Sequence, residues 1–191
     1  WVSLRAGIVP TLTVPAAGAP WRHRVLGRVG QERFGVLHAA DLGATVQGFL
    51  PEGYGWVGVG FYNGDGYASR ELNAVKNLEV AARLAPLAGV EGAAGITVLL
   101  TYVYGATGAG SARADRLTAG LAFDDDVLGV GTTLTWAMGV EDDGGTDGLL
   151  TEVFVRTNPW EGLLLAARGQ VFIRDLGVAD DLIATVQGAI G

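Results

Sequence analysis

Hydrophobic and polar residues alternate with a period of two along most of the chain. In residues 163–174, apolar side chains at Leu165, Val171 and Ile173 alternate with polar ones at Arg168 and Gln170. Such alternation is typical of a β-strand that buries only one face in an apolar environment. The pattern predicts an all-β protein without convincing helices. Ten strands are expected, at residues 1–9, 39–49, 54–62, 77–85, 96–104, 116–124, 128–140, 149–157, 163–175 and 181–189.

The lengths of these strands and of their connections favour a membrane protein. Each strand has about nine residues or more, as a tilted transmembrane strand needs, whereas strands of soluble sheets average about five or six. Compact turns, such as Pro51-Glu52-Gly53, alternate with long polar segments, of which residues 10–37 are the longest. Short turns at one end and long loops at the other are typical of antiparallel transmembrane β-barrels.

The polar face of the strands is unlike the wet face of a soluble sheet. It is rich in Gly, Ala and Thr with isolated charges, and Lys76 is the only lysine. We therefore expect this face to line a lumen and the apolar face to contact lipid. Aromatic residues near strand ends are expected to form interfacial girdles, although they could also cap the core of a soluble sandwich. They are Phe49, Tyr54, Trp56, Phe61, Tyr62, Tyr102, Tyr104 and Trp160.

Composition narrows the classes of protein further. The 191 residues have a mean hydropathy of +0.33, yet no window supplies the roughly 20 apolar residues of a spanning helix. The absence of cysteine excludes disulfides and thiolate chemistry. A net charge of −7 argues against a nucleic-acid partner. The length predicts a single domain over residues 1–191. Because the first residue is Trp1 and not Met, either a leader has been removed or this is a segment of a longer protein, and we favour the segment because Trp1-Val2-Ser3-Leu4 has the pattern of the inside of a strand.

Charged residues on the polar faces are the candidate pore-lining groups. Cationic side chains in a lumen favour anions. The alternative is that Arg83 pairs with Glu79 and Arg156 with Glu152, which would tie the wall together and select nothing. The predicted lumen charges are Arg5, Asp41, Glu79, Arg83, Arg116, Glu152, Arg156, Arg168 and Arg174.

The long loop at residues 10–37 has a local excess of basic residues in an acidic chain. Folded into the lumen, its guanidinium groups would form a constriction that attracts anions. Outside the lumen, they would be solvated or bind anionic sugars, and the sequence favours neither arrangement. The charged and aromatic residues of this loop are Trp21, Arg22, His23, Arg24, Arg28, Glu32 and Arg33.

Catalytic and metal-binding motifs are weak. None of Ser3, Ser69 and Ser111 lies in a nucleophile elbow, and the two histidines are His23 and His38. The acidic clusters at residues 124–126 and 141–147 lack the spacing of an EF-hand. We therefore expect no enzyme activity, no cofactor and no metal.

Part of the chain resembles a known family. The residues Phe61-Tyr62-Asn63-Gly64-Asp65-Gly66-Tyr67, then Lys76, then the run from Glu79 to Pro86, are similar to the phosphate-selective porins, the family of porins O and P. The resemblance covers roughly residues 40–86 and implies a barrel in the bacterial outer membrane, often a homotrimer, with an inward-folded loop. A single lysine departs from the lysine-rich interior of its phosphate-specific members. The end at Ile190-Gly191 lacks a terminal aromatic residue, and ten strands are fewer than the roughly sixteen of aqueous porins, so either strands are missing or the barrel is a smaller, divergent one.

The sequence as a whole predicts an outer-membrane porin. Its water-filled channel would pass small hydrophilic solutes or ions by passive diffusion, with a bias toward anions. Membrane lipid, lipopolysaccharide and small anionic or neutral solutes are the expected partners. The alternatives are a soluble or surface β-sheet binding module and, less favoured, an outer-membrane enzyme that uses Ser and His.

Overall fold

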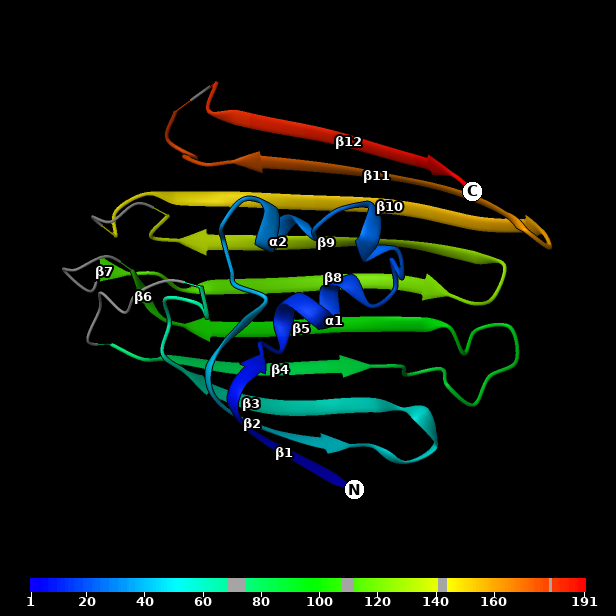
Figure 1. Ribbon diagram of the computed structural model, residues 1–191, viewed down its shortest axis with the longest axis horizontal. Helices are drawn as coiled ribbons and strands as arrows, with labels where there is room; N and C mark the ends of the chain where they lie inside the picture. The colour runs from blue at the N-terminus through cyan, green and yellow to red at the C-terminus, as the bar shows by residue number, and fades with distance from the viewer. Residues whose placement is uncertain (69–74, 108–111, 141–143, 179) are drawn as a thin grey trace.

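A computed structural model of the chain describes residues 1–68, 75–107, 112–140, 144–178 and 180–191. Ten strands form one antiparallel sheet in the order β1-β2-β3-β4-β5-β8-β9-β10-β11-β12, so that the strands of this sheet follow one another in chain order (Figure 1). A second, two-stranded sheet joins β6 (Ala106–Thr107) to β7 (Ala112–Arg113). The strands of the large sheet are β1 (Val2–Pro10), β2 (Ala40–Phe49), β3 (Gly55–Tyr62), β4 (Asn77–Leu84), β5 (Ile96–Tyr104), β8 (Arg116–Asp124), β9 (Leu128–Met138), β10 (Asp147–Trp160), β11 (Leu163–Ile173) and β12 (Leu182–Ile190).

The prediction of an all-β, antiparallel protein is confirmed, and every expected strand is present within a few residues of its expected bounds. The sheet is not closed into a barrel, because β1 pairs only with β2 and β12 only with β11. The expectation that helices are absent is wrong. Short helices are α1 (Thr13–Gly18), η1 (Arg24–Leu26), α2 (Gly30–Arg33) and η2 (Pro51–Gly53).

These helices have three to six residues, which is too short to produce a helical period in the sequence. No helix in the part of the chain that the structure describes has the length and apolar character needed to cross a bilayer.

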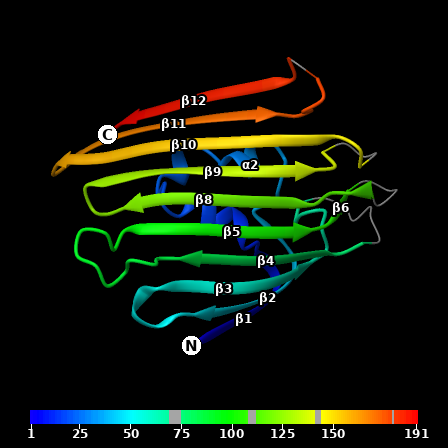
Figure 2. The ribbon, with the colours of Figure 1, turned by 180° about the vertical axis from the view of Figure 1, so that it is seen from behind.

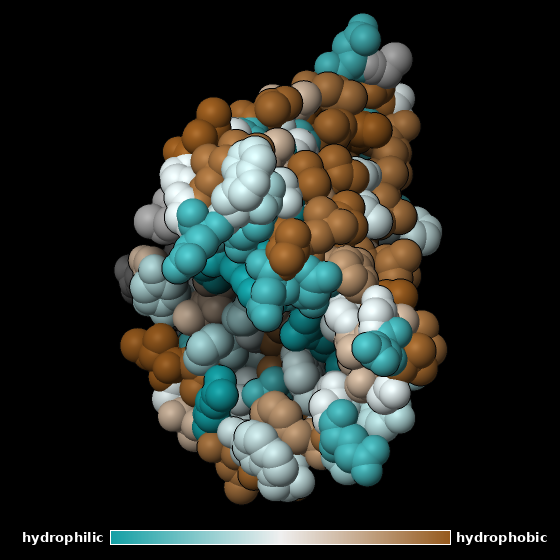
Figure 3. Space-filling view, turned by 90° about the vertical axis from the view of Figure 1, so that its right-hand side faces the viewer, coloured by the Kyte–Doolittle hydropathy of each residue, from teal (hydrophilic) through white to brown (hydrophobic). Residues whose placement is uncertain are grey.

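Polarity across the sheet is the reverse of that in a water-soluble protein. On the outward face, Leu100 and Leu121 are 56% and 55% exposed. On the inward face, Glu152, Arg156 and Arg168 are each only 1% exposed. Seen from the end that carries both termini, hydrophilic residues gather in the middle of the molecule and hydrophobic ones around much of its outer rim (Figure 3).

The two ends of the sheet differ in their connections. Turns of a few residues join β2 to β3, β8 to β9 and β10 to β11 at the end where both termini lie (Figure 1). The segments that follow β1, β3, β5 and β9 leave the opposite end and are longer. We call the first the short-turn end and the second the long-loop end.

Aromatic residues lie near both ends, but not all of them point outward. Phe61 and Tyr104 are exposed at the long-loop end, and Trp160 is exposed at the short-turn end. The expectation that Trp56 and Tyr62 belong to an outer girdle is wrong, because both side chains point inward. Trp56 packs against the buried cluster of Ala16, Ala17 and Leu99, and Tyr62 is 3% exposed.

Residues 11–39 lie across the inward face of the sheet, with α1 and α2 in front of its central strands (Figure 1) and hidden behind them from the other side (Figure 2). We call these residues the inward segment. Trp21 is 1% exposed and packs in one buried cluster with Ala122, Phe154 and Ala166. A second cluster joins Val36 of the segment to three wall residues, which are Ala137, Leu150 and Phe172.

Candidate functional site: the inward face and the segment across it

Two buried glutamates of the sheet bind the backbone of the inward segment. Glu79 on β4 accepts hydrogen bonds from the backbone N–H groups of Leu12 and Thr13, at 2.8 and 2.7 Å, and from the Thr13 hydroxyl at 2.5 Å. Glu152 on β10 accepts from the N–H of Gly30 at 2.8 Å. Because N–H groups at the start of a helix lack intrahelical partners, these carboxylates satisfy donors that would otherwise be buried unpaired.

Cationic and amide side chains of the sheet bind carbonyl groups of the same segment. Arg168 donates to the carbonyl oxygen of Arg28 at 2.8 Å, and its guanidinium carbon lies 4.8 Å from the centre of the Trp21 ring. Arg116 donates to the carbonyl of Val36 at 3.1 Å. These charged groups of the wall are therefore occupied in holding the segment.

A group of arginines surrounds one carboxylate at the short-turn end. Asp124, the last residue of β8, lies 2.9 Å from Arg22 of the inward segment and forms an ion pair with Arg156 of β10. Arg83 of β4 is half-buried and lies within electrostatic range of the same carboxylate. The Asp125 carboxylate is also within electrostatic range of Arg156 and Arg22, so three cations face two anions and one positive charge is in excess. We call the three arginines the arginine group.

His23 lies beside the arginine group. Burial lowers its pKa below 6.5, and the positive charges of Arg156 and Arg22 lower it further. The imidazole is therefore neutral at pH 7 and adds no charge to the group.

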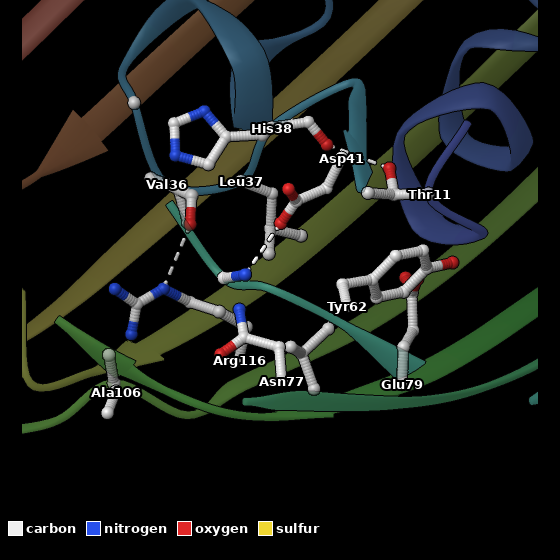
Figure 4. Close-up of a pocket in the computed structure, with 14 residues that line it drawn as sticks. Thr11, Val36, Leu37, His38, Asp41, Tyr62, Asn77, Glu79, Ala106 and Arg116 are labelled. Atoms are coloured by element: carbon white, nitrogen blue, oxygen red, sulfur yellow. Dashed lines mark hydrogen bonds between the residues drawn. The ribbon is translucent and has the colours of Figure 1, made fainter. Parts of the chain in front are cut away.

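A polar cavity of about 80 Å³ opens near the long-loop end (Figure 4). Asp41, Glu79, His38 and Arg116 are among its lining residues, and Figure 4 shows the Arg116 guanidinium turned toward the carbonyl of Val36. Asp41 accepts from the N–H groups of Leu42 and Gly64 at 2.7 and 2.6 Å. This volume is well above the roughly 10–15 Å³ that one water needs, so the cavity is large enough to hold water.

The remaining predicted lumen residues do not converge with the arginine group. Arg5 is exposed on the edge strand β1, opposite Thr45. Arg174 follows β11 at the long-loop end and pairs with Asp181 at 2.9 Å. Arg33 is exposed, and Arg24 and Arg28 both face Glu32, at 2.5 and 3.9 Å.

The alternative pairing of wall charges is wrong for both predicted pairs. Arg156 bonds to Asp124 and not to Glu152, and no ion pair among the described residues joins Arg83 to Glu79. Sequence reasoning missed Asp124, which is not among the predicted lumen charges. The signal was available, because Asp124 has the same parity as Arg116 and Thr118 and so belongs to the inward face of β8.

Within the described ranges, no three His, Asp or Glu side chains come together in a way that could hold a metal ion. The residues Glu141, Asp142 and Asp143 of one acidic cluster, and Ser69 and Ser111, lie outside the residues that the structure describes.

Comparison with known proteins gives no match: no family model, no curated protein and no solved structure is similar to this chain.

Proposed function

We propose that this chain forms the wall and the constriction of a porin in the bacterial outer membrane. Small hydrophilic solutes or ions would diffuse passively through this porin, with a bias toward anions. The observation that carries the proposal is the reversed polarity of the sheet. Apolar side chains such as Leu100 and Leu121 are exposed on the outward face, whereas Thr118, Glu152 and Arg156 are buried on the inward one.

Lipid explains this distribution better than water does. A large, continuous apolar surface is rare on soluble monomeric proteins and marks an interaction site. In a transmembrane sheet of this type, apolar side chains face lipid along the whole strand and polar ones face the interior. The short-turn and long-loop ends, and the exposed aromatic residues near both of them, also suit a sheet that spans an outer membrane.

The anion bias follows from the arginine group. Arg22, Arg83 and Arg156 carry three positive charges beside the two negative charges of Asp124 and Asp125, which leaves one positive charge in excess. Arg22 is 45% exposed, so its charge acts on a solute that passes the short-turn end. A local excess of cations raises the concentration of anions nearby and lowers that of cations.

Conductance in a planar lipid bilayer under a salt gradient tests the proposal. We expect discrete steps with a reversal potential that favours anions. Arg22→Gln and Arg83→Gln should each reduce this preference, because each removes one of the cations around Asp124. Arg174→Gln is the matched control, since Arg174 pairs with Asp181 beyond the end of β11 and should leave the reversal potential unchanged.

Three results would contradict parts of the proposal. Steps that favour cations would refute the anion bias and leave the channel. Insertion without steps would refute the channel and leave the membrane location. A protein that stays folded and monodisperse without detergent would refute the membrane location and favour the binding module.

A further inference from the structure

We infer that Glu79 and Glu152 are positioning residues that fix the inward segment to the wall, so that the segment is a permanent constriction and not a movable gate. The effect on conduction rests on the proposed function, whereas the attachment itself does not. Solutes would then pass only through the space that the attached segment leaves.

The first attachment is at the start of the segment. The Glu79 carboxylate, 1% exposed, receives three hydrogen bonds from two consecutive residues, Leu12 and Thr13. The Thr13 hydroxyl also lies 2.8 Å from that of Thr101 on β5. Thr13 is itself fully buried, so these bonds are shielded from water.

The second attachment is on the same inward face, in the other half of the sheet, at β10. The Glu152 carboxylate, also 1% exposed, accepts from the N–H of Gly30 at the start of α2 and from the Gln170 amide. Gly30 fits closely there, because a Cβ at this position would lie 3.1 Å from a methyl carbon of Leu150. The two glutamates thus hold the segment at both of its α-helices.

Further contacts between these two points also hold the segment to the wall. Trp21 is buried against Phe154 between the two helices. Gln187 on the edge strand β12 donates to the carbonyl of Leu26 at 3.3 Å. Because the bonds extend from β4 to β12, a gating movement would have to break them together, whereas mobile lids are drawn from regions with few buried contacts.

Engineered disulfides separate a fixed segment from a gate. The natural chain has no cysteine, so Thr13→Cys with Thr101→Cys would create a single bridge between the segment and β5. Val46→Cys with Val59→Cys is the matched control, because these residues are paired across the neighbouring wall strands β2 and β3 and their exposed side chains lie on the outward face, away from the segment. Conductance is measured in the oxidised protein and again after reduction.

We expect both bridged proteins to conduct equally well before and after reduction. A Thr13–Thr101 bridge that abolishes conductance, with recovery on reduction and no such effect in the control, would overturn the inference. Thr13→Cys removes the hydroxyl bond to Glu79, but both glutamates and their bonds from the backbone N–H groups remain, so these variants test the inference even if the glutamine variants below do not fold.

Removing the anchors tests the attachment without reference to conduction. We expect Glu79→Gln combined with Glu152→Gln to speed amide hydrogen exchange at Leu12, Thr13 and Gly30 at least tenfold, and to increase single-channel conductance. Glu91→Gln combined with Glu161→Gln, in the exposed turns after β4 and β10, also removes two negative charges and should change neither.

Unchanged exchange in the double variant would overturn the anchoring role. A wild-type protein that inserts without conducting, but protects these three amides, would refute the channel and still support the anchoring.

Discussion

Replacement of Leu100 by arginine distinguishes a sheet that faces lipid from one that faces water. Leu100 is 56% exposed on the outward face and is the fifth of the nine residues of β5. In a water-soluble protein, a substitution at such a surface position changes the free energy of unfolding by less than about 0.5 kcal/mol. In a bilayer, the same guanidinium would have to lie in hydrocarbon.

The position of Leu100 sets the size of the effect. Four residues separate it from each end of the strand, which at about 3.4 Å per residue and a tilt of about 40° places it about 10 Å from either boundary. Arginine at the bilayer midplane costs about 2–4 kcal/mol, which falls to about 0–1 kcal/mol near the interface. We therefore expect Leu100→Arg to lower the folding equilibrium constant roughly a hundredfold.

The measurement is reversible unfolding by guanidinium from lipid vesicles, followed by tryptophan fluorescence. Leu78→Arg is the matched control, because Leu78 is also outward and exposed but is the second residue of β4, next to the long-loop end. We expect it to cost less than about 1 kcal/mol. Equal, small costs at both positions would refute the assignment of the outward face to lipid.

Three further predictions concern the inward segment and the turns. Trp21→Ala should lower the local stability of the segment by about 3–5 kcal/mol, measured by amide exchange, because the indole is 1% exposed, whereas Trp160→Ala at the exposed end of β10 should leave that exchange unchanged. Hydrogen bonds from the N–H groups of Leu128 and Val127 lower the pKa of Asp125 below 3.8, so this turn should be fully stabilised above about pH 4 and lose that stability as the pH falls through the lowered pKa. An NMR titration of the turn amides checks this, and Asp125→Asn should abolish the transition. Gly55→Ala should destabilise the protein by at least about 1 kcal/mol more than Gly53→Ala, as measured by unfolding in guanidinium. Both glycines have positive φ, but a Cβ at Gly55 would lie 2.0 Å from the carbonyl oxygen of Arg83, whereas a Cβ at Gly53 would have no other atom within 4 Å.

The strands could be predicted because their signal is local. Each side chain on β8, from Arg116 to Asp124, alternates between the outward apolar face and the inward polar one, so a window of nine residues carries the whole pattern. The register follows from the same alternation, since a shift by one residue would turn Leu121 inward and Thr118 outward.

The inward segment could not be predicted in the same way, because its conformation depends on distant residues. Thr13 bonds to a carboxylate 66 residues away, and Gly30 to one 122 residues away. Helices of four and six residues have little stability of their own. The error at Trp56 has a different cause, because Trp56 has the same parity as the inward Tyr62 on β3 and the local alternation alone could have placed it on the inward face.

The long-range hydrogen bonds of the inward segment have a consequence for the order of folding. Strands that are adjacent in the large sheet also follow one another along the chain. The sheet can therefore grow one strand at a time, without closing large loops between its strands. The segment, however, bonds to Glu79 on β4, Glu152 on β10 and Gln187 on β12, the last of them 161 residues from its partner Leu26. Residues 11–39 therefore leave the ribosome before nine of the ten sheet strands, yet they reach their final contacts only after the last of those strands has joined.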